Sequence, residues 1–177
     1  EDHIIINNLA NNLEAPYQNF LAQSLVKKNE LFIYRYHQES SSAWVVFYNP
    51  IQIRNKLPRR LDEKQIRKLG RELARFHQAC TNICNQLPNP SKNVVTDIHK
   101  LIKSVNNNEI KMCDHHKTLV LKHCDIFLNN ANKVNYMTEF ETIPVFIDWN
   151  IGNFSITADG KFFSRWDYDW FRMSSRV

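Results

Sequence analysis

Three oxygen-bearing side chains in the C-terminal part of the chain could together hold a divalent cation and orient a hydroxyl group. Asp148 and Asn153 have four residues between them, and a predicted hairpin then leads to Asp167. The turn of that hairpin contains Asp159-Gly160, a strong turn signal, so we expect its closing end to bring Asp167 back beside Asn153. Carboxylate and amide oxygens are the ligands that Mg²⁺ prefers. The spacing therefore predicts three oxygen ligands at one edge of a small sheet.

These residue types match the few protein groups that phosphoryl transfer from ATP requires. The reaction depends mainly on positioning and on neutralising charge. A carboxylate must accept a hydrogen bond from the acceptor hydroxyl, and amide and carboxylate oxygens must hold Mg²⁺ against the phosphates. Asp148 suits the first role, whereas Asn153 and Asp167 suit the second. The pair also has the kinase spacing of Asp, four residues and Asn.

The surroundings of the Asp148 pair distinguish it more than the pair itself does. In a chain this rich in Asn, about one such pair is expected by chance, and the spacing recurs at Asp2 with Asn7 and at Asp125 with Asn130. Only the Asp148 copy combines a preceding strand, a glycine, a hairpin and a second acid. Turn chemistry, which favours Asp and Asn in loops, is the alternative explanation.

The elements that would position these residues follow an irregular order, which predicts an α+β fold and not a doubly wound sheet. The clearest helix begins with a capping-box pattern at Asp62 and Gln65. We expect a helix from about Ile4 to Val26 with a break at Pro16, a hairpin of Leu31–Tyr36 and Ala43–Tyr48 around Glu39–Ser42, helices at Asp62–Cys80, Val94–Val105 and Lys117–Val134, and short strands from Ile143 onward.

Composition excludes several classes of protein. The chain has 177 residues, 43% of them hydrophobic, and a net charge of +5, as expected of a globular protein. No run approaches the roughly 20 apolar residues of a membrane span, and no nucleic-acid-binding motif accompanies the modest charge. We therefore expect neither a membrane nor a nucleic acid as partner. Four cysteines without a tight framework indicate a cytoplasmic protein, and the oligomeric state is left open.

Three stretches resemble the aminoglycoside phosphotransferase and choline kinase superfamily, whose fold is protein-kinase-like. Phe146–Asn153 is similar to the catalytic loop of the family, and Arg165–Asp169 to its metal-binding segment. Leu69–His77 is similar to the family's Leu-Gly-x-x-Leu-Ala-x-Leu-His helix. All three glycines of the chain, Gly70, Gly152 and Gly160, fall at family positions.

The resemblance implies a role for each matching residue. Asp148 is the expected catalytic base, and Asn153 and Asp167 are the expected Mg²⁺ ligands. Asp169 matches the family's second acid, which is either a further metal ligand or a local hydrogen-bond acceptor. Asn49 and Ile51 lie in the expected hinge that meets the adenine of ATP. The implied activity is ATP-dependent phosphorylation of a hydroxyl on a small molecule, such as an aminoglycoside, choline or a sugar.

The resemblance also implies a division into lobes. Residues 1–55 would form a remnant of the N-lobe sheet with the hinge, and residues 56–177 a mostly helical C-lobe with a short catalytic hairpin. The Gly-rich phosphate cover and the ATP-binding lysine have no counterpart, and Phe146-Ile147 replaces the family's His-Gly. We therefore expect a partial chain that is inactive by itself.

Two other functions are compatible with the sequence. A non-catalytic kinase relative could keep the fold as an interaction module, which the altered Phe146-Ile147 and the missing Gly-rich loop favour. Alternatively, Asp167-Tyr168-Asp169 could be the Asp-x-Asp metal site of a glycosyltransferase. The long helical middle of the chain argues against a nucleotide-sugar fold.

Overall fold

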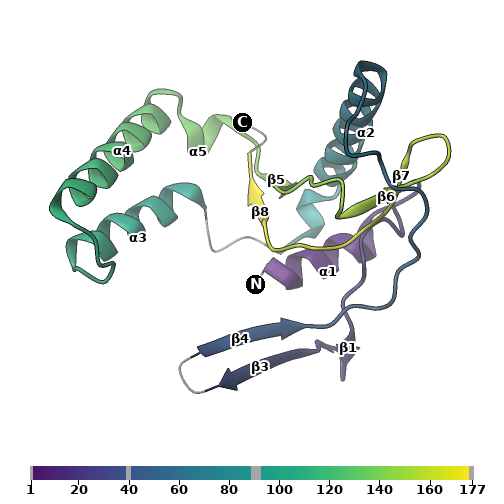
Figure 1. Ribbon diagram of the computed structural model, residues 1–177, viewed down its shortest axis with the longest axis horizontal. Helices are drawn as coiled ribbons and strands as arrows, with labels where there is room; N and C mark the ends of the chain where they lie inside the picture. The colour runs from purple at the N-terminus through teal and green to yellow at the C-terminus, as the bar shows by residue number, and fades with distance from the viewer. Residues whose placement is uncertain (1, 39–40, 89–92, 176–177) are drawn as a thin grey trace. The chain divides into compact units, whose positions relative to one another are not determined.

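The computed structural model describes residues 2–38, 41–88 and 93–175 and has the predicted α+β class, with small two-stranded sheets (Figure 1). The chain divides into two compact units. The first comprises Glu1–Asn89 and Pro144–Arg172, and the second comprises Pro90–Ile143 and Met173–Val177. The predicted boundary after residue 55 lies inside the first unit, and the assignment of kinase lobes stays a prediction.

The strands of the structure pair locally. β1 (Val26–Lys27) pairs with β2 (Glu30–Leu31), β3 (Ile33–Gln38) with β4 (Ser41–Val46), and β6 (Phe154–Ile156) with β7 (Phe162–Arg165), each antiparallel. β5 (Ile143–Phe146) pairs with β8 (Phe171–Ser174), and both strands contain points where the chain passes from one unit to the other.

Both predicted hairpins are present. β3 and β4 lie within two residues of the expected strands, with Ile33 opposite Val46. In the predicted turn, Glu39 and Ser40 lie outside the described residues. β6 and β7 flank Asp159-Gly160, where Gly160 has a φ of 76°, a left-handed conformation that glycine adopts without steric cost.

The first helix is shorter than predicted. α1 (Asp2–Asn12) ends well before Val26, so the helical prediction for the residues after Asn12 is wrong. Proline removes a backbone donor at position 16, and the chain beyond it bonds to β7. The Arg165 N–H donates to the Phe20 carbonyl at 2.6 Å, and the Ala22 N–H donates to the Arg165 carbonyl at 3.0 Å. This pairing joins segments far apart in the sequence.

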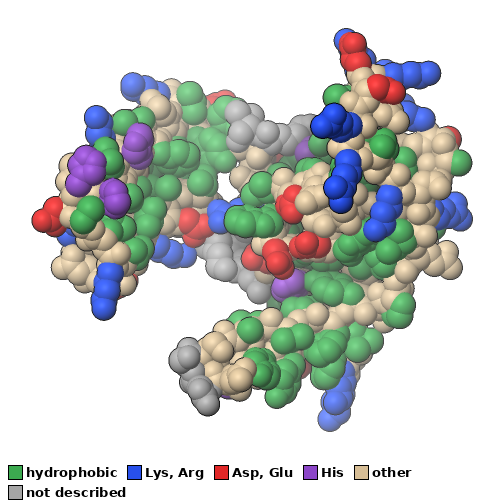
Figure 2. Space-filling view, in the orientation of Figure 1, with side chains coloured by type: hydrophobic (Ala, Val, Ile, Leu, Met, Phe, Trp, Pro, Cys, Tyr) green, Lys and Arg blue, Asp and Glu red, His purple; other side chains and the backbone are tan. Residues whose placement is uncertain are grey.

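The helix α2 (Glu63–Asn82) begins as predicted. Asp62 accepts a hydrogen bond from the Gln65 N–H at 2.8 Å, and the Gln65 side chain accepts one from the Asp62 N–H at 3.0 Å. Phe76 and Cys80 are buried. Ile66, expected on the apolar face, is 56% exposed, and the buried residues of α2 are Glu72, Phe76 and Cys80. Lys and Arg side chains gather over this helix in Figure 2. The short 3₁₀ helix η1 (Cys84–Gln86) follows.

Aromatic rings form the core of the first unit. Phe20 stacks on Phe162 with ring centroids 4.7 Å apart, and Trp149 stacks on Phe162 at 5.2 Å. Phe76 makes edge contacts with Phe20, Phe162 and Trp149. Since Trp149 follows Asp148 directly, this cluster anchors the loop after β5 to the core.

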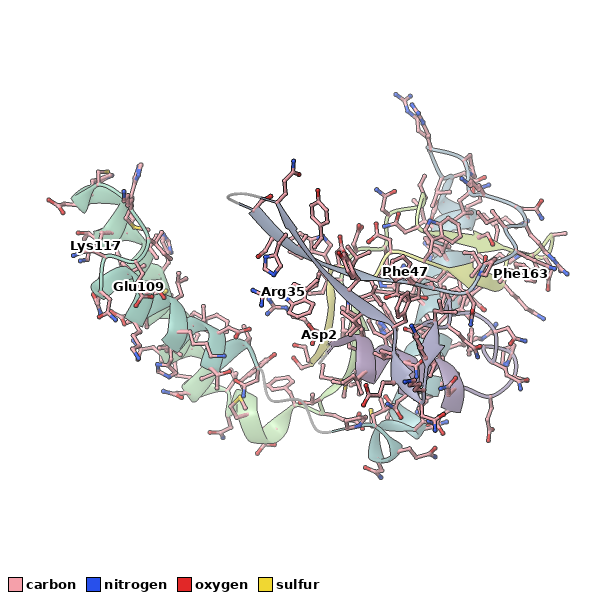
Figure 3. All side chains as sticks on the ribbon, turned by 90° about the horizontal axis from the view of Figure 1, so that it is seen from below. Asp2, Arg35, Phe47, Glu109, Lys117 and Phe163 are labelled. Carbon is pink, nitrogen blue, oxygen red and sulfur yellow. The ribbon has the colours of Figure 1, made fainter. Side chains whose placement is uncertain are left out.

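The second unit contains α3 (Val94–Asn106), α4 (Asp114–Lys133) and α5 (Tyr136–Glu139), so two predicted helices are confirmed. Glu109, between α3 and α4 (Figure 3), accepts hydrogen bonds from the side chains of Ser104 at 2.7 Å and Asn107 at 3.1 Å. Within the described ranges, no helix has both the length and the apolar character to cross a membrane. All four cysteines are free.

Candidate functional site

The loop after β5 is folded by its own polar side chains. Asp148 Oδ1 accepts a hydrogen bond from the Asn150 N–H at 2.9 Å, and Asn150 Oδ1 accepts one from the Gly152 N–H at 2.9 Å. These are the local side-chain-to-backbone bonds typical of Asp and Asn in turns. A Cβ atom on Gly152 would lie 3.3 Å from Asn150 Oδ1, which is a crowded contact. The absence of a side chain on Gly152 therefore leaves room for the turn that its N–H closes with Asn150 Oδ1.

The side chains of Asp148 and Asn153 meet directly. Asn153 Nδ2 donates to Asp148 Oδ2 at 3.1 Å, and both residues are half-buried. Because the amide nitrogen faces Asp148, the oxygen Oδ1 is the atom of Asn153 that remains for a cation. The first two predicted site residues are thus brought together.

The residue before Asp167 is bonded to the same loop at the end of β7. The Trp166 N–H donates to the Asn153 carbonyl at 3.0 Å, as expected if the hairpin closes beside Asn153. Asp167 is the next residue and is exposed, with a φ of 66°. This left-handed conformation is one that Asp tolerates better than most residues.

Asp169 is joined to Asp167 through its backbone: the Asp169 N–H donates to Asp167 Oδ1 at 3.5 Å. Tyr48 Oη and His3 Nδ1 share a hydrogen bond of 2.7 Å. Burial raises the pKa of Tyr48, and the charge of Asp169 raises it further. Burial lowers the pKa of His3, and Asp169 acts in the opposite direction. The charge of Asp169 therefore acts on Tyr48 and His3, whereas its backbone is bonded to Asp167.

A buried arginine that the sequence analysis missed lies against this loop. Arg165 is 1% exposed, and its Nη2 donates to the Asp148 carbonyl at 2.6 Å. Its guanidinium carbon lies 4.9 Å from the ring centroid of Phe146 and 4.5 Å from that of Trp149. Burial lowers the pKa of Arg165 to about 10, and the carboxylates of Asp148 and Asp167 act in the opposite direction.

The sequence held one signal for this arginine. In the strand Phe162–Trp166 it is the one charged residue, between Ser164 and Trp166 and two positions before Asp167. Alternation along the strand would place Arg165 on the other face of β7 from the buried Phe162 and Ser164. Both Ser164 and Arg165 are buried instead, because the segment Phe20–Ala22 covers the strand.

The residue types in this loop and directly after β7 suit a hard cation. The carboxylates of Asp148 and Asp167 and the amide of Asn153 offer oxygen ligands, which Mg²⁺ prefers. Zn²⁺ sites usually include nitrogen or sulfur ligands as well. Across the residues that the structure describes, no three His, Cys, Asp or Glu side chains form a metal-binding group. A cation held by Asp148 or Asp167 would therefore depend on the amide oxygen of Asn153 as well.

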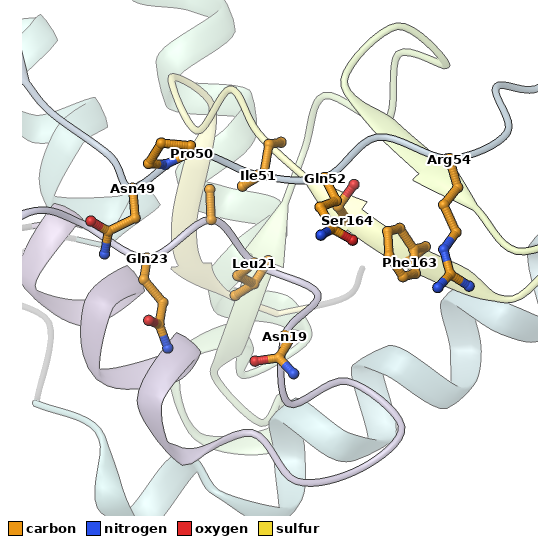
Figure 4. Close-up of a pocket in the computed structure, with 11 residues that line it drawn as sticks. Asn19, Leu21, Gln23, Asn49, Pro50, Ile51, Gln52, Arg54, Phe163 and Ser164 are labelled. Atoms are coloured by element: carbon orange, nitrogen blue, oxygen red, sulfur yellow. The ribbon is translucent and has the colours of Figure 1, made fainter.

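Both predicted adenine contacts line one cavity of about 410 Å³ (Figure 4). A cavity of this size is in the range of small-molecule sites. The Asn49 N–H donates to the Gln23 carbonyl at 2.8 Å, which fixes the backbone of Asn49 at the edge of this cavity. β7 contributes Phe163 and Ser164 to this cavity before it leads to Asp167. The lining residues are Asn19, Leu21, Ala22, Gln23, Asn49, Pro50, Ile51, Gln52, Arg54, Phe163 and Ser164.

Comparison of the chain with protein-family models, with curated proteins and with solved structures gives no match.

Proposed function

We propose that the chain carries the Mg²⁺–ATP catalytic segment of a small-molecule phosphotransferase with a protein-kinase-like fold and a hydroxyl acceptor. Two hydrogen bonds support this proposal. Asn153 Nδ2 donates to Asp148 at 3.1 Å, and the Trp166 N–H donates to Asn153 at 3.0 Å. The second bond extends the β6–β7 hairpin by one residue pair beyond Phe154 and Arg165, so the hairpin closes at Asn153 and Asp167 follows directly.

Each residue has a defined role in this proposal. The Asp148 carboxylate accepts the hydrogen bond of the acceptor hydroxyl, orients its oxygen and takes its proton. Asn153 Oδ1 and the Asp167 carboxylate would hold Mg²⁺, which supplies charge neutralisation on the phosphates. Asp169 has a weaker claim as a ligand because its charge acts on Tyr48 and His3.

The cavity beside β7 is the proposed place for the adenine base. Leu21, Ile51 and Phe163 offer apolar surface for the ring faces, and the side-chain amide of Asn49 offers both a donor and an acceptor to its edge. Because β7 runs from this cavity to Asp167, one strand would fix the position of the adenine ring relative to Mg²⁺. The free cysteines fit a reducing cytoplasm, where ATP is available.

One observation favours a non-catalytic kinase-like module as the second candidate. Both carboxylate oxygens of Asp148 already accept hydrogen bonds inside the loop, as a purely structural turn residue would. The glycosyltransferase alternative fits less well, because the described elements before β5 are helices and two-stranded antiparallel pairs and not the alternating strands and helices of a nucleotide-sugar fold.

The test is Mg²⁺-dependent phosphoryl transfer by a form of the protein extended at both ends with the flanking coding sequence. ADP release and phosphorylated product are measured with choline, aminoglycosides and sugars as acceptors, with and without EDTA. The proposal expects a product with at least one acceptor, only when Mg²⁺ is present. Binding of MgATP without any product would favour the non-catalytic module.

A further inference from the structure

The burial of Arg165 is costly, and no ion pair with another described residue offsets it. Its Nε and Nη1 atoms have no hydrogen-bond partner within the described ranges, and its charge rests against the faces of Phe146 and Trp149. A buried charge without a paired carboxylate usually lowers stability relative to an apolar side chain of similar volume. The stability of the fold therefore does not account for an arginine at this position.

The backbone of Arg165 holds β7 in place without its side chain. Its N–H donates to the Phe20 carbonyl at 2.6 Å. Its carbonyl accepts hydrogen bonds from the Ala22 N–H at 3.0 Å and from the Tyr168 hydroxyl at 2.8 Å. A substitution of the Arg165 side chain therefore removes its bond to the Asp148 carbonyl and leaves these backbone bonds of β7 in place.

The residues before Asp148 cannot make an equivalent connection. Phe146 and Ile147 have no polar side-chain atoms, and Ile147 is 54% exposed. Arg165 instead ties the loop from the strand that leads to Asp167. Its donor is charged, and hydrogen bonds from charged donors are roughly twice as strong as neutral ones.

We propose that Arg165 is a positioning residue whose guanidinium fixes the backbone of Asp148 relative to Asp167. It sets the geometry between the loop and the metal-binding segment and touches neither substrate nor cation. The catalytic meaning of this role rests on the proposed function, whereas the mechanical link can be tested without activity.

The first experiment measures amide hydrogen exchange in the 177-residue chain and in R165M and R165K. Methionine keeps much of the volume without the charge or the donors, whereas lysine keeps the charge. R35M is the matched control, because Arg35 also lies over an aromatic ring, that of Trp44 at 5.2 Å, far along the chain from the loop. Thermal unfolding of all four proteins is measured in parallel.

A positioning role predicts a local effect. In R165M, the amides of Gly152, Asn153 and Trp166 exchange about tenfold faster or more, as expected for loss of a charged hydrogen bond. The amides of α2 and the midpoint of unfolding stay unchanged, or the midpoint rises. R165K gives a smaller effect, and R35M gives none at the loop. Faster exchange throughout the first unit with a lower midpoint would make Arg165 an ordinary core residue, and unchanged exchange at the loop would also refute the proposal.

The second experiment uses the extended form and separates turnover from binding. R165M is expected to lower kcat by about a hundredfold, in the range known for a misplaced catalytic group, with little change in the KM for ATP. A rise in KM alone would contradict the proposal. If the unaltered extended form transfers no phosphoryl group, the proposed function fails, and the exchange measurement still decides whether Arg165 holds the loop.

Discussion

Replacement of Asp148 by asparagine separates catalysis from folding at the candidate site. Asp148 accepts hydrogen bonds from the Asn150 N–H and from Asn153 Nδ2. Asparagine has nearly the same shape but one acceptor oxygen, so one of the two bonds is lost. Because one ordinary hydrogen bond contributes about 1 kcal/mol and the loop is partly exposed, we expect D148N to lower the free energy of unfolding by about that amount.

The effect of D148N on turnover is expected to be much larger. General-base catalysis contributes about 10²–10⁴-fold, which corresponds to about 2.7–5.4 kcal/mol in the barrier. The base contacts the acceptor and not the nucleotide, so the Kd for MgATP is expected to stay within a factor of about three. Steady-state kinetics, titration calorimetry and thermal unfolding on the extended form give the three quantities.

The matched control is D125N. Asp125 has the same spacing to Asn130 as Asp148 has to Asn153, but it lies exposed on α4. The kcat of D125N is therefore expected to be unchanged. Unchanged turnover in D148N would leave Asp148 as an ordinary loop residue. Equal losses of turnover, of MgATP binding and of stability would show that the loop is a structural turn.

Three further predictions concern conformation, pH and nucleotide. G160A is expected to lower the free energy of unfolding by about 1–2 kcal/mol, because Gly160 has a φ of 76° and a Cβ there would lie 2.9 Å from Lys68 Nζ; G70A, with open space around it, is expected to raise it by up to about 1 kcal/mol, both measured by urea unfolding. Burial lowers the pKa of His3, so the unfolded chain binds this proton more readily and stability rises with pH through the range just below 6.5; an NMR titration that puts the pKa at or above that value would contradict this. The 177-residue chain is expected to bind MgATP more weakly than the extended form, because no Gly-rich segment covers the phosphates; submicromolar binding by the short chain in calorimetry would show that the nucleotide site is misplaced.

The elements that the sequence predicted well are specified by neighbouring residues. The start of α2 is fixed by Asp62 and Gln65, three positions apart, and the β6–β7 turn by Asp159-Gly160. The contact of Asp148 with Asn153 is similar, because two Asx-type turns inside the loop fold it. Such features depend on local geometry that a pattern of residue types records.

The features that the sequence did not predict depend on distant partners. The residues after Asn12 have helical spacing, yet their backbone bonds to Arg165, far away along the chain. The sequence predicts Asp169 as a metal ligand, but its charge also acts on His3 and Tyr48, which come from distant parts of the chain. The β1–β2 turn uses Lys28 and Asn29 at positive φ, and this dipeptide is not among the strong hairpin signals.

The buried charge of Arg165 bears on the choice between a structural turn and a catalytic loop. A loop that only reverses the chain needs its own Asx turns, and these are complete without any contact to β7. An apolar side chain at position 165 would pack against Phe146 and Trp149, and no charged group would have to be removed from water. Arg165 instead makes a 2.6 Å bond to the Asp148 carbonyl. A site that must hold two carboxylates at a fixed separation has a use for such a bond, whereas a turn does not, and for this reason we favour the catalytic interpretation over the structural one.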